Sequence, residues 1–318
     1  MTDRPAITVV GSTMIDLISY LERMPDQGET VFGRSFAQGF GGKGANQAVM
    51  AALLGADVAM VNRVGDDSFG RETIANFRSF GVDVSQVGVE PTYSGVANIM
   101  VEPSGDNRII LGPGANERLS ASHVERAFAA LRRPGVVLSQ LEVPQSAILR
   151  GFQLAKHHGA TTILNPAPAA PVAPEILELC DWLIPNETEC ELLVRATTGS
   201  CPSDLAERTR ALGESCGVAV VTTLGANGAM LYRPGIDDTV RHLHAPPVEV
   251  RDSTGAGDAF VGAFGYAIGR GIDPLDAIEF ALELASDSVT RPGTQISFPT
   301  GTHLDNLLAR TIVGRPTT

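Results

Sequence analysis

The sequence predicts an α/β fold in which a mostly parallel sheet is covered by helices on both faces, with a small β-sheet lid beside it. From residue 135 onward, short apolar strands alternate with helical segments, a rhythm typical of parallel sheets. Two earlier pairs of β-segments do not fit this alternation and predict the separate lid. Hydrophobic residues make up 43% of the 318 residues, enough to bury a sizeable core.

Turn residues and changes of hydrophobic pattern bound each predicted element. In the first part of the chain, strands are predicted at 6–10, 14–20, 30–38, 58–64, 95–101 and 107–111, and helices at 43–54 and 69–80. In the second part, strands are predicted at 135–140, 161–164, 182–184 and 218–222, and helices at 145–157, 187–194, 256–269, 274–290 and 303–309. We therefore expect one domain over residues 1–318, with lid segments at roughly 14–38 and 95–111.

Charge and composition narrow the class of protein. The net charge of −12 argues against nucleic acid or an anionic membrane as a partner. The start of the chain lacks the apolar core of a signal peptide, and no stretch reaches the roughly 18 apolar residues of a membrane span. We expect a cytoplasmic protein whose cysteines are reduced, because their spacing fits neither a C-x-x-C motif nor a zinc site. These cysteines are Cys180, Cys190, Cys201 and Cys216.

The most informative stretch is Asp-Ser-Thr-Gly-Ala-Gly-Asp at 252–258, which opens an apolar helical run. Small residues at such a turn leave backbone N–H groups open to an anion, and the helix N-terminus favours negative charge. Asp258 falls in the first helical turn, where a carboxylate is able to take a proton from a hydroxyl. The pattern suggests phosphoryl transfer to an alcohol. The alternative is that Asp258 only caps the helix.

A second glycine-rich loop, Gly-Phe-Gly-Gly-Lys-Gly-Ala-Asn at 39–46, also opens a helix. Its glycines let backbone approach a ligand, and Lys43 and Asn46 supply donors. The spacing matches the dinucleotide fingerprint G-x-G-x-x-G, but that fingerprint belongs directly after the first strand, which ends near Gly11. A P-loop is excluded because Gly44, not Ser or Thr, follows Lys43. A purely structural glycine turn is the other interpretation.

Several further polar residues each allow two interpretations. The segment 186–189 either caps a helix or lets Glu189 orient water around magnesium. The segment 222–228 either lines a ligand site past a strand or forms a hairpin turn. Carboxylates or amides just beyond predicted strands are either solvated or accept sugar hydroxyls; these are Asp16, Glu142 and Asn165. Asp252 and the segment 291–294 form either an ion pair or a loop around a monovalent cation.

Taken together and in this order, the motifs resemble the ribokinase family of carbohydrate kinases. The matching segments are Gly-Gly-Lys-Gly-Ala-Asn-Gln-Ala at 41–48, Asn-Pro-Ala-Pro-Ala at 165–169, Asn-Glu-Thr-Glu at 186–189, Thr-Leu-Gly at 223–225, the 252–258 turn and Val-Thr-Arg-Pro-Gly at 289–293. The resemblance covers nearly the whole chain, from about Val9 to Pro299. It implies a three-layer α/β/α domain whose β-sheet lid closes over a sugar and commonly forms a dimer interface.

The resemblance also implies a reaction and a role for each motif. An ATP-dependent kinase would phosphorylate a primary hydroxyl, O5 of D-ribose in the type reaction, with Asp258 as the base. Gly255, Ala256 and Gly257 would form the anion hole, and Asp16, Gly42, Lys43, Asn46 and Glu142 would hold the sugar. Asn186, Thr223, Gly225, Gly228 and Gly257 would line the ATP site. Potassium would lie among Asp252, Thr254, Ser288, Arg291, Gly293 and Ser297, and Glu189 would act on magnesium through water.

Two residues depart from the family pattern. Met14 stands where the family usually has Asn, so one sugar hydroxyl loses a partner, and Leu282 replaces the Asn or His often found near adenine. A ketose, a deoxy-sugar acid or a nucleoside is therefore the alternative acceptor on the same scaffold. Two alternatives come from other classes of protein. A nicotinamide-dependent oxidoreductase is supported only by the G-x-G-x-x-G spacing at 39–44, which is misplaced in the chain. A catalytically silent sugar-binding protein conflicts with the intact 252–258 turn.

Overall fold

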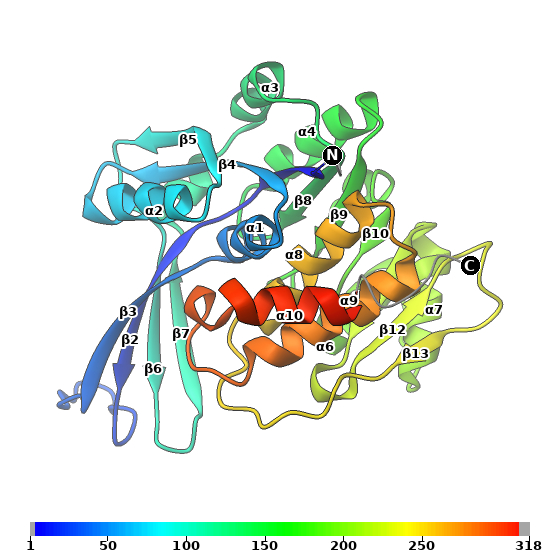
Figure 1. The fold of residues 1–318 in the computed structure, drawn as a ribbon. Helices are drawn as coiled ribbons and strands as arrows, with labels where there is room; N and C mark the ends of the chain where they lie inside the picture. The colour runs from blue at the N-terminus through cyan, green and yellow to red at the C-terminus, as the bar shows by residue number, and fades with distance from the viewer. Residues whose placement is uncertain (1–3, 312–318) are drawn as a thin grey trace.

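A nine-stranded sheet forms the middle layer of the computed structural model, which describes residues 4–311 (Figure 1). From one edge to the other, the strands are β13 (Arg241–Leu243), β12 (Ala229–Tyr232), β11 (Ala219–Thr223), β10 (Trp182–Leu183), β9 (Thr161–Asn165), β8 (Val136–Gln140), β1 (Ala6–Val10), β4 (Asp57–Gly65) and β5 (Asp83–Glu90). Only the β11–β12 and β12–β13 pairs are antiparallel. The prediction of a mostly parallel sheet is therefore confirmed.

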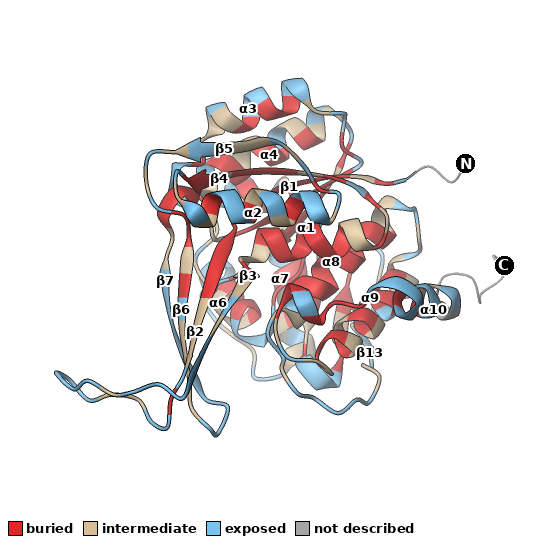
Figure 2. Ribbon diagram, turned by 60° about the vertical axis from the view of Figure 1, so that its left-hand side comes forward, coloured by how far each residue is buried: buried red, intermediate tan, exposed pale blue. Residues whose placement is uncertain are grey.

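Helices cover both faces of this sheet, because alternate residues of its strands are buried on opposite sides. Ile7 and Val9 belong to one apolar core, whereas Val10 belongs to the other. The first core is closed by α1 (Lys43–Leu53), α2 (Ser68–Ser79), α8 (Ala256–Gly269), α9 (Pro274–Ser288) and α10 (Gly301–Thr311). The second is closed by α3 (Ala121–Ala130), α4 (Gln145–His157), α5 (Pro174–Leu177), α6 (Glu187–Thr198) and α7 (Leu205–Cys216). Figure 2 shows the most buried residues along the sheet, α1 and α8.

A separate four-stranded sheet forms the lid and extends away from the body (Figures 1 and 2). Its strands, in order, are β3 (Ser35–Gly41), β2 (Met14–Tyr20), β6 (Val96–Val101) and β7 (Asn107–Gly112). The two outer pairs are antiparallel and the central β2–β6 pair is parallel. Because β2 follows β1 and β3 leads into α1, the lid is joined to the body through its central strand β2 and its edge strand β3.

The structure differs from the sequence prediction mainly at edges and element ends. The second lid strand lies at 35–41 rather than 30–38, because its register begins at Ser35 opposite Tyr20, where β2 ends. The elements β5, α3, α5, α7, β12 and β13 were not predicted. Their alternation is weak: β5 is an edge strand, and α7 carries mostly polar residues. Helix α9 ends at Ser288 instead of 290.

Two other expectations from composition are tested by the fold. All four cysteines are free thiols, as predicted, and burial raises the pKa of Cys190 to about 11. Within residues 4–311 no helix combines the length and apolarity needed to span a membrane.

Candidate active site

The carboxylate of Asp258 does not cap its helix. Helix α8 begins after Gly255, which adopts a left-handed conformation with φ 80° and makes no side-chain cap. The Asp258 oxygens instead accept hydrogen bonds from two side chains of α1, Asn46 Nδ2 at 2.8 Å and Gln47 Nε2 at 3.1 Å. The interpretation of Asp258 as a simple helix cap is therefore wrong, and its carboxylate is held at the junction of α1 and α8.

A cavity of about 150 Å³ lies between the lid and the body, and we call it the lid cavity. The lid lines it with Met14, Asp16, Ala97, Ile99, Ile109 and Leu111, and the body lines it with Gly42, Lys43, Asn46, Glu142, Thr254, Gly255, Asp258 and Thr294. Every residue that the family resemblance assigned to sugar binding borders this one cavity, whereas Asn165, which the sequence also offered for sugar hydroxyls, does not line it. The body supplies charged and hydrogen-bonding groups, while most of the lid residues are apolar.

The charges of the lid cavity are strongly coupled. Burial, with the nearby Glu142 and Asp258 carboxylates, raises the pKa of Asp16 to about 7. Burial also raises the pKa of Glu142. Burial alone would lower the pKa of Lys43, but the carboxylates of Asp258, Glu142 and Glu189 raise it. The Lys43 ammonium therefore stays charged in a site that is otherwise rich in carboxylates.

The 39–46 loop brings backbone close to the ends of β1 and β2. A Cβ atom at Gly42 would lie 2.6 Å from the backbone nitrogen of Met14, and one at Gly44 would lie 2.6 Å from that of Ser12. The backbone nitrogen of Lys43 then donates to Glu142 at 2.9 Å. The loop follows lid strand β3, not the first strand of the parallel sheet, so the position required of a dinucleotide fingerprint is absent here.

A second cavity, of about 440 Å³, lies between α8, α9 and the segment 245–250, and we call it the α8–α9 cavity. It is lined by Thr223, Gly225, Ala226, Gly228, Ala245, Pro246, Pro247, Val248, Val250, Ser253, Ala256, Gly257, Phe260, Leu282, Ala285, Ser286 and Val289. The predicted residues Thr223, Gly225, Gly228 and Gly257 are among them. The 252–258 turn thus borders both cavities, because Thr254 and Gly255 face the lid cavity while Ser253 and Gly257 face this one.

The 222–228 segment joins antiparallel β11 and β12, which confirms the hairpin interpretation, and it also lines the α8–α9 cavity. Asn186 is placed differently, because it caps α6 and pairs with Thr223 without lining the cavity. Its side chain accepts from the backbone nitrogen of Glu189, and the Glu189 carboxylate accepts from that of Asn186, both at 2.9 Å. The capping interpretation of 186–189 is therefore confirmed. Burial raises the pKa of Glu189.

The residues expected around potassium lie on two segments, 252–254 and 288–297, which the carboxylate of Asp252 connects. Asp252 accepts hydrogen bonds from the backbone nitrogens of Thr254 at 2.9 Å and Gly293 at 2.8 Å. Arg291 donates from Nε and Nη2 to the carbonyl of Ser297, at 2.9 and 2.7 Å, and also pairs with Asp287. In residues 4–311, no three His, Cys, Asp or Glu side chains are grouped to hold a metal ion.

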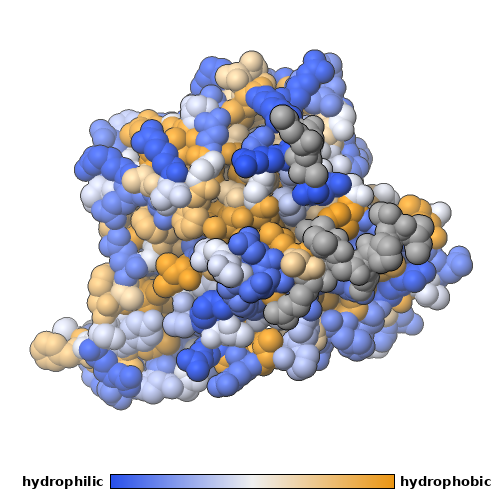
Figure 3. All heavy atoms as spheres, viewed as in Figure 1, coloured by the Kyte–Doolittle hydropathy of each residue, from blue (hydrophilic) through white to orange (hydrophobic). Residues whose placement is uncertain are grey.

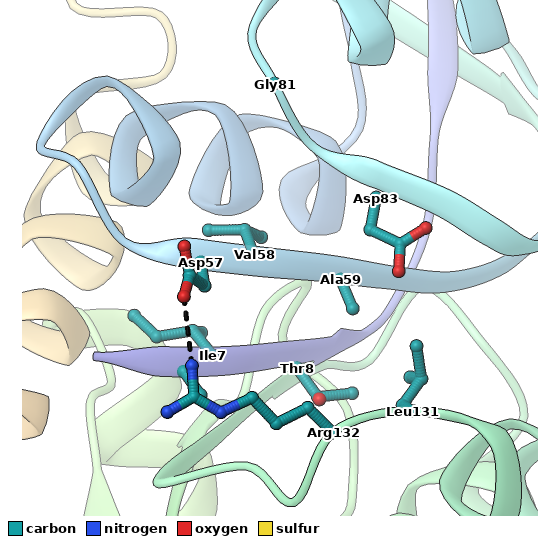
Figure 4. Close-up of a pocket in the computed structure, with 10 residues that line it drawn as sticks. Ile7, Thr8, Asp57, Val58, Ala59, Gly81, Asp83, Leu131 and Arg132 are labelled. Atoms are coloured by element: carbon teal, nitrogen blue, oxygen red, sulfur yellow. Dashed lines mark hydrogen bonds and ion pairs between the residues drawn. The ribbon is translucent and has the colours of Figure 1, made fainter. Parts of the chain in front are cut away.

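Two further cavities lie outside these sites. One, of about 450 Å³, adjoins the lid cavity and shares Met14, Leu111 and Glu142 with it. The other, of about 200 Å³, lies where β1, β4 and β5 begin, and an Arg132–Asp57 hydrogen bond of 3.1 Å crosses it (Figure 4). Ligands of open α/β sheets bind at the opposite, carboxyl ends of the strands. The lid and α8–α9 cavities both lie at that end.

Some lining residues were not found from the sequence. Ala97, Ile99, Ile109 and Leu111 face the lid cavity only because the β2–β6–β7 register puts them on the same side as Asp16. The alternation of β6 and β7 predicts two faces but not which one covers a ligand. The segment 245–250 carries a Pro-Pro turn signal, which indicated a loop and nothing about a ligand.

The raised pKa of Asp16 makes a prediction about stability. Because the folded state holds this proton up to about pH 7, ionising Asp16 costs folding free energy above its ordinary pKa of 3.8, and that cost is complete above pH 7. Asp16→Asn should therefore raise the thermal midpoint at pH 8, with a difference that shrinks toward pH 5. The exposed Asp26→Asn is the control. A difference that does not change with pH would contradict this assignment.

Comparison with known proteins fits this geometry. Residues 4–301 match the model of the pfkB family carbohydrate kinases. The chain is 39% identical over 305 residues to the deoxyribokinase of Salmonella typhi, covering 92% of this chain and 95% of that one. It is 38% identical over 309 residues to the ribokinase of Mus musculus, covering 92% of each. The structure of Arabidopsis thaliana ribokinase complexed with ribose and ATP matches with a TM-score of 0.84 at 31% identity, covering 96% of this chain and 99% of that one. The chain therefore belongs to the pfkB family of carbohydrate kinases and is an ATP-dependent sugar kinase, as its motifs predict.

Proposed function

We propose that this kinase transfers the γ-phosphoryl group of ATP to O5 of D-ribose, which gives ribose 5-phosphate and ADP. The observation that carries this proposal is the 252–258 turn, which borders the lid cavity on one side and the α8–α9 cavity on the other. Sugar in the first cavity and nucleotide in the second would meet at this turn. The related Arabidopsis thaliana ribokinase was solved with ribose and ATP, the two substrates proposed here.

In the proposed reaction Asp258 is the base. It takes the proton from O5, the oxygen forms a bond to the γ-phosphorus, and the bond to the β–γ bridging oxygen breaks as ADP leaves with its electron pair. The N–H groups at the start of α8, from Gly255 to Gly257, face the charge on the transferring group. The apolar lid residues exclude water, which would compete with the sugar as acceptor.

Each side of the reaction has its own set of residues. We propose that Asp16, Gly42, Lys43, Asn46 and Glu142 hold the sugar. The nucleotide site would be lined by Thr223, Gly225, Gly228 and Gly257. Asn186 would position Thr223 through the β-bridge between these two residues. Support for the nucleotide assignment is the apolar character of the α8–α9 cavity, where Phe260, Leu282 and Val289 suit a purine ring. Leu282 would contact the base by packing alone.

Two metal ions complete the proposal. Magnesium would enter with ATP, and Glu189 would orient water around it. Potassium would be held by oxygens, partly backbone carbonyls, of Asp252, Thr254, Ser288, Arg291, Gly293 and Ser297; the Arg291 guanidinium itself donates to the Ser297 carbonyl. Its support is the link that Asp252 makes between the 254 and 293 backbones. When bound, the ion would neutralise Asp252 and stabilise the turn.

We also propose that two copies of this chain meet through their lids. The lid exposes large apolar side chains, including Phe36 at 63% and Ile110 at 60%, together with Tyr20, Ile109 and Leu111. Apolar residues reach the surface of the lid at the lower left of Figure 3. A patch of this kind on an otherwise acidic protein favours a second copy over a charged partner.

The ATP-consuming reaction fits a cytoplasmic location.

The direct test is ADP release from Mg-ATP against a panel of pentoses, ketoses, deoxy-sugar acids and nucleosides. We expect turnover led by ribose, with a KM below about 1 mM, and faster in potassium than in sodium at equal ionic strength. Nucleosides belong in the panel because the cavity that adjoins Met14 has room for a base. No turnover with any acceptor would contradict the proposed function, and equal rates in both salts would remove the potassium site.

Met14 favours a second candidate acceptor, 2-deoxyribose. It lines the lid cavity on the same strand face as Asp16 and is only 3% exposed. Its thioether is at most a weak acceptor, so a hydroxyl placed beside it gains no strong hydrogen bond. A sugar that lacks one hydroxyl loses nothing there. The deoxyribokinase of Salmonella typhi is among the relatives at 39% identity.

We therefore expect Met14→Asn to change acceptor preference. The amide adds a donor and an acceptor to the lid cavity, so the ratio of kcat/KM for ribose over 2-deoxyribose should rise about 10-fold or more. Met100→Asn, on the opposite face of the lid, is the matched control and should leave the ratio unchanged. An unchanged ratio in Met14→Asn would remove this residue from specificity.

A further inference from the structure

Asp258 lies between two chains of amide side chains, which we call the amide relay: the half-buried Asn76 and the buried Gln295, Asn46, Gln47 and Gln140. On one side, Asn76 Nδ2 donates to Gln295 Oε1 at 2.8 Å, and Gln295 Nε2 donates to Asn46 Oδ1 at 3.0 Å. On the other side, Gln140 Nε2 donates to Gln47 Oε1 at 2.5 Å. Asn46 and Gln47 then donate to the two Asp258 oxygens, at 2.8 and 3.1 Å.

Of the relay residues, only Asn46 lines the lid cavity, and the others lie beneath it in the body. Gln47 and Gln140 are 0% exposed, and neither they nor Gln295 line the lid cavity or the α8–α9 cavity. Close backbone contacts fix their positions. A Cβ atom at Gly262 of α8 would lie 2.7 Å from the Gln47 carbonyl, and one at Gly11 would lie 2.2 Å from Gln140 Oε1. The relay is therefore built into the packing of α1 against α8 and β1.

The direction of every amide in the relay follows from the charge of Asp258. An ionised carboxylate only accepts hydrogen bonds, so the NH₂ groups of Asn46 and Gln47 must face it. Their carbonyl oxygens then point away and require donors, which Gln295 and Gln140 supply. A protonated Asp258 has no acceptor among these amides, so its proton must lie on the side of the lid cavity, where the sugar hydroxyl would be.

The relay matters because several other charged groups lie close to Asp258. Three other carboxylates interact with Asp258, those of Asp16, Glu142 and Glu189. The Lys43 ammonium is the nearby cation, and it interacts with Asp258, Glu142 and Glu189. Neutral N–H donors favour the charged form of a carboxylate without adding charge. They also fix the rotation of the carboxylate, because one donor holds each oxygen.

We propose that Gln47 and Gln295 are positioning residues for phosphoryl transfer, which hold the Asp258 carboxylate ionised and aimed at the acceptor hydroxyl. This inference rests on the proposed function, in which Asp258 takes the proton as the oxygen–phosphorus bond forms and ADP leaves. Gln47 acts directly on Asp258, and Gln295 acts through Asn46. We expect the effect of substitution to fall with this distance along the relay.

The test is the single-turnover rate of sugar phosphorylation as a function of pH, with sugar affinity measured separately by calorimetry. Gln47→Met keeps the length of the side chain but removes its three hydrogen bonds, those donated to Asp258 and Asn165 and the one accepted from Gln140. The rate should fall about 10-fold to 100-fold, the loss expected for one hydrogen bond to a charged group. The acidic limb of the profile should move to higher pH, while sugar affinity changes by less than about 3-fold. Gln295→Met should show the same changes, smaller in size.

A second variant separates orientation from simple packing. Gln47→Glu keeps the shape but places another carboxylate against Asp258, so the acidic limb should move further upward than in Gln47→Met. This variant and Gln295→Met decide the question if Gln47→Met does not fold. Gln153→Met, an exposed glutamine on α4, is the control for the substitution itself.

An acidic limb that stays in place in these relay variants would overturn the proposal, as would a rate loss explained by sugar affinity alone. The wild-type protein distinguishes the two levels of the account. Sugar-dependent turnover by wild type with unmoved variant profiles would refute the relay and leave the kinase function standing. No wild-type turnover with any sugar would refute both.

Discussion

The two hydrogen bonds from α1 to the carboxylate of Asp258 are the contact on which the rest of the site depends. Helix α1 begins directly after the lid strand β3, and α8 begins directly after the 252–258 turn. Asn46 and Gln47 therefore connect the lid side of the molecule with the turn that borders both cavities. Gly262 lets the two helices approach closely enough for this contact, because a Cβ atom there would collide with the α1 backbone. The lid, the lid cavity and the α8–α9 cavity are thus all positioned around the Asp258 side chain.

The site works against the charge of the whole protein. A chain with a net charge of −12 repels ATP at a distance, so the local N–H groups at the start of α8 must overcome that field. Inside the lid cavity, burial raises the pKa of Asp16 and of Glu142. These groups retain protons more readily than exposed carboxylates, and under the proposed function sugar hydroxyls would supply hydrogen bonds that favour their ionised forms. We infer that ionising Asp16 costs folding stability, and that the carboxylate is retained because it recognises the sugar.

The sequence predicted the parts of the site that depend on local backbone chemistry. The glycine-rich turns at 39–46 and 252–258 carry their meaning in adjacent residues, and both lie where ligands would approach. Parts that depend on tertiary register were not predictable. Ile99 and Ile109 line the lid cavity only because of strand pairing. Gln140 lies inside a strand with no local pattern to mark it, and Gln47 falls within the 41–48 motif, which assigned it no role. Asn186 and Glu189 carried a capping signal, and the structure bears that out.

The central claim is that Asp258 removes the proton from the acceptor hydroxyl. The measurement that tests it most directly is the single-turnover rate of Asp258→Asn with saturating sugar and Mg-ATP, beside its sugar affinity and its thermal midpoint. We expect the rate to fall about 10²-fold to 10⁴-fold, the usual contribution of a general base, while the protein stays folded and still binds sugar. A rate within a few-fold of wild type would contradict the account, because neutral Asn cannot accept that proton.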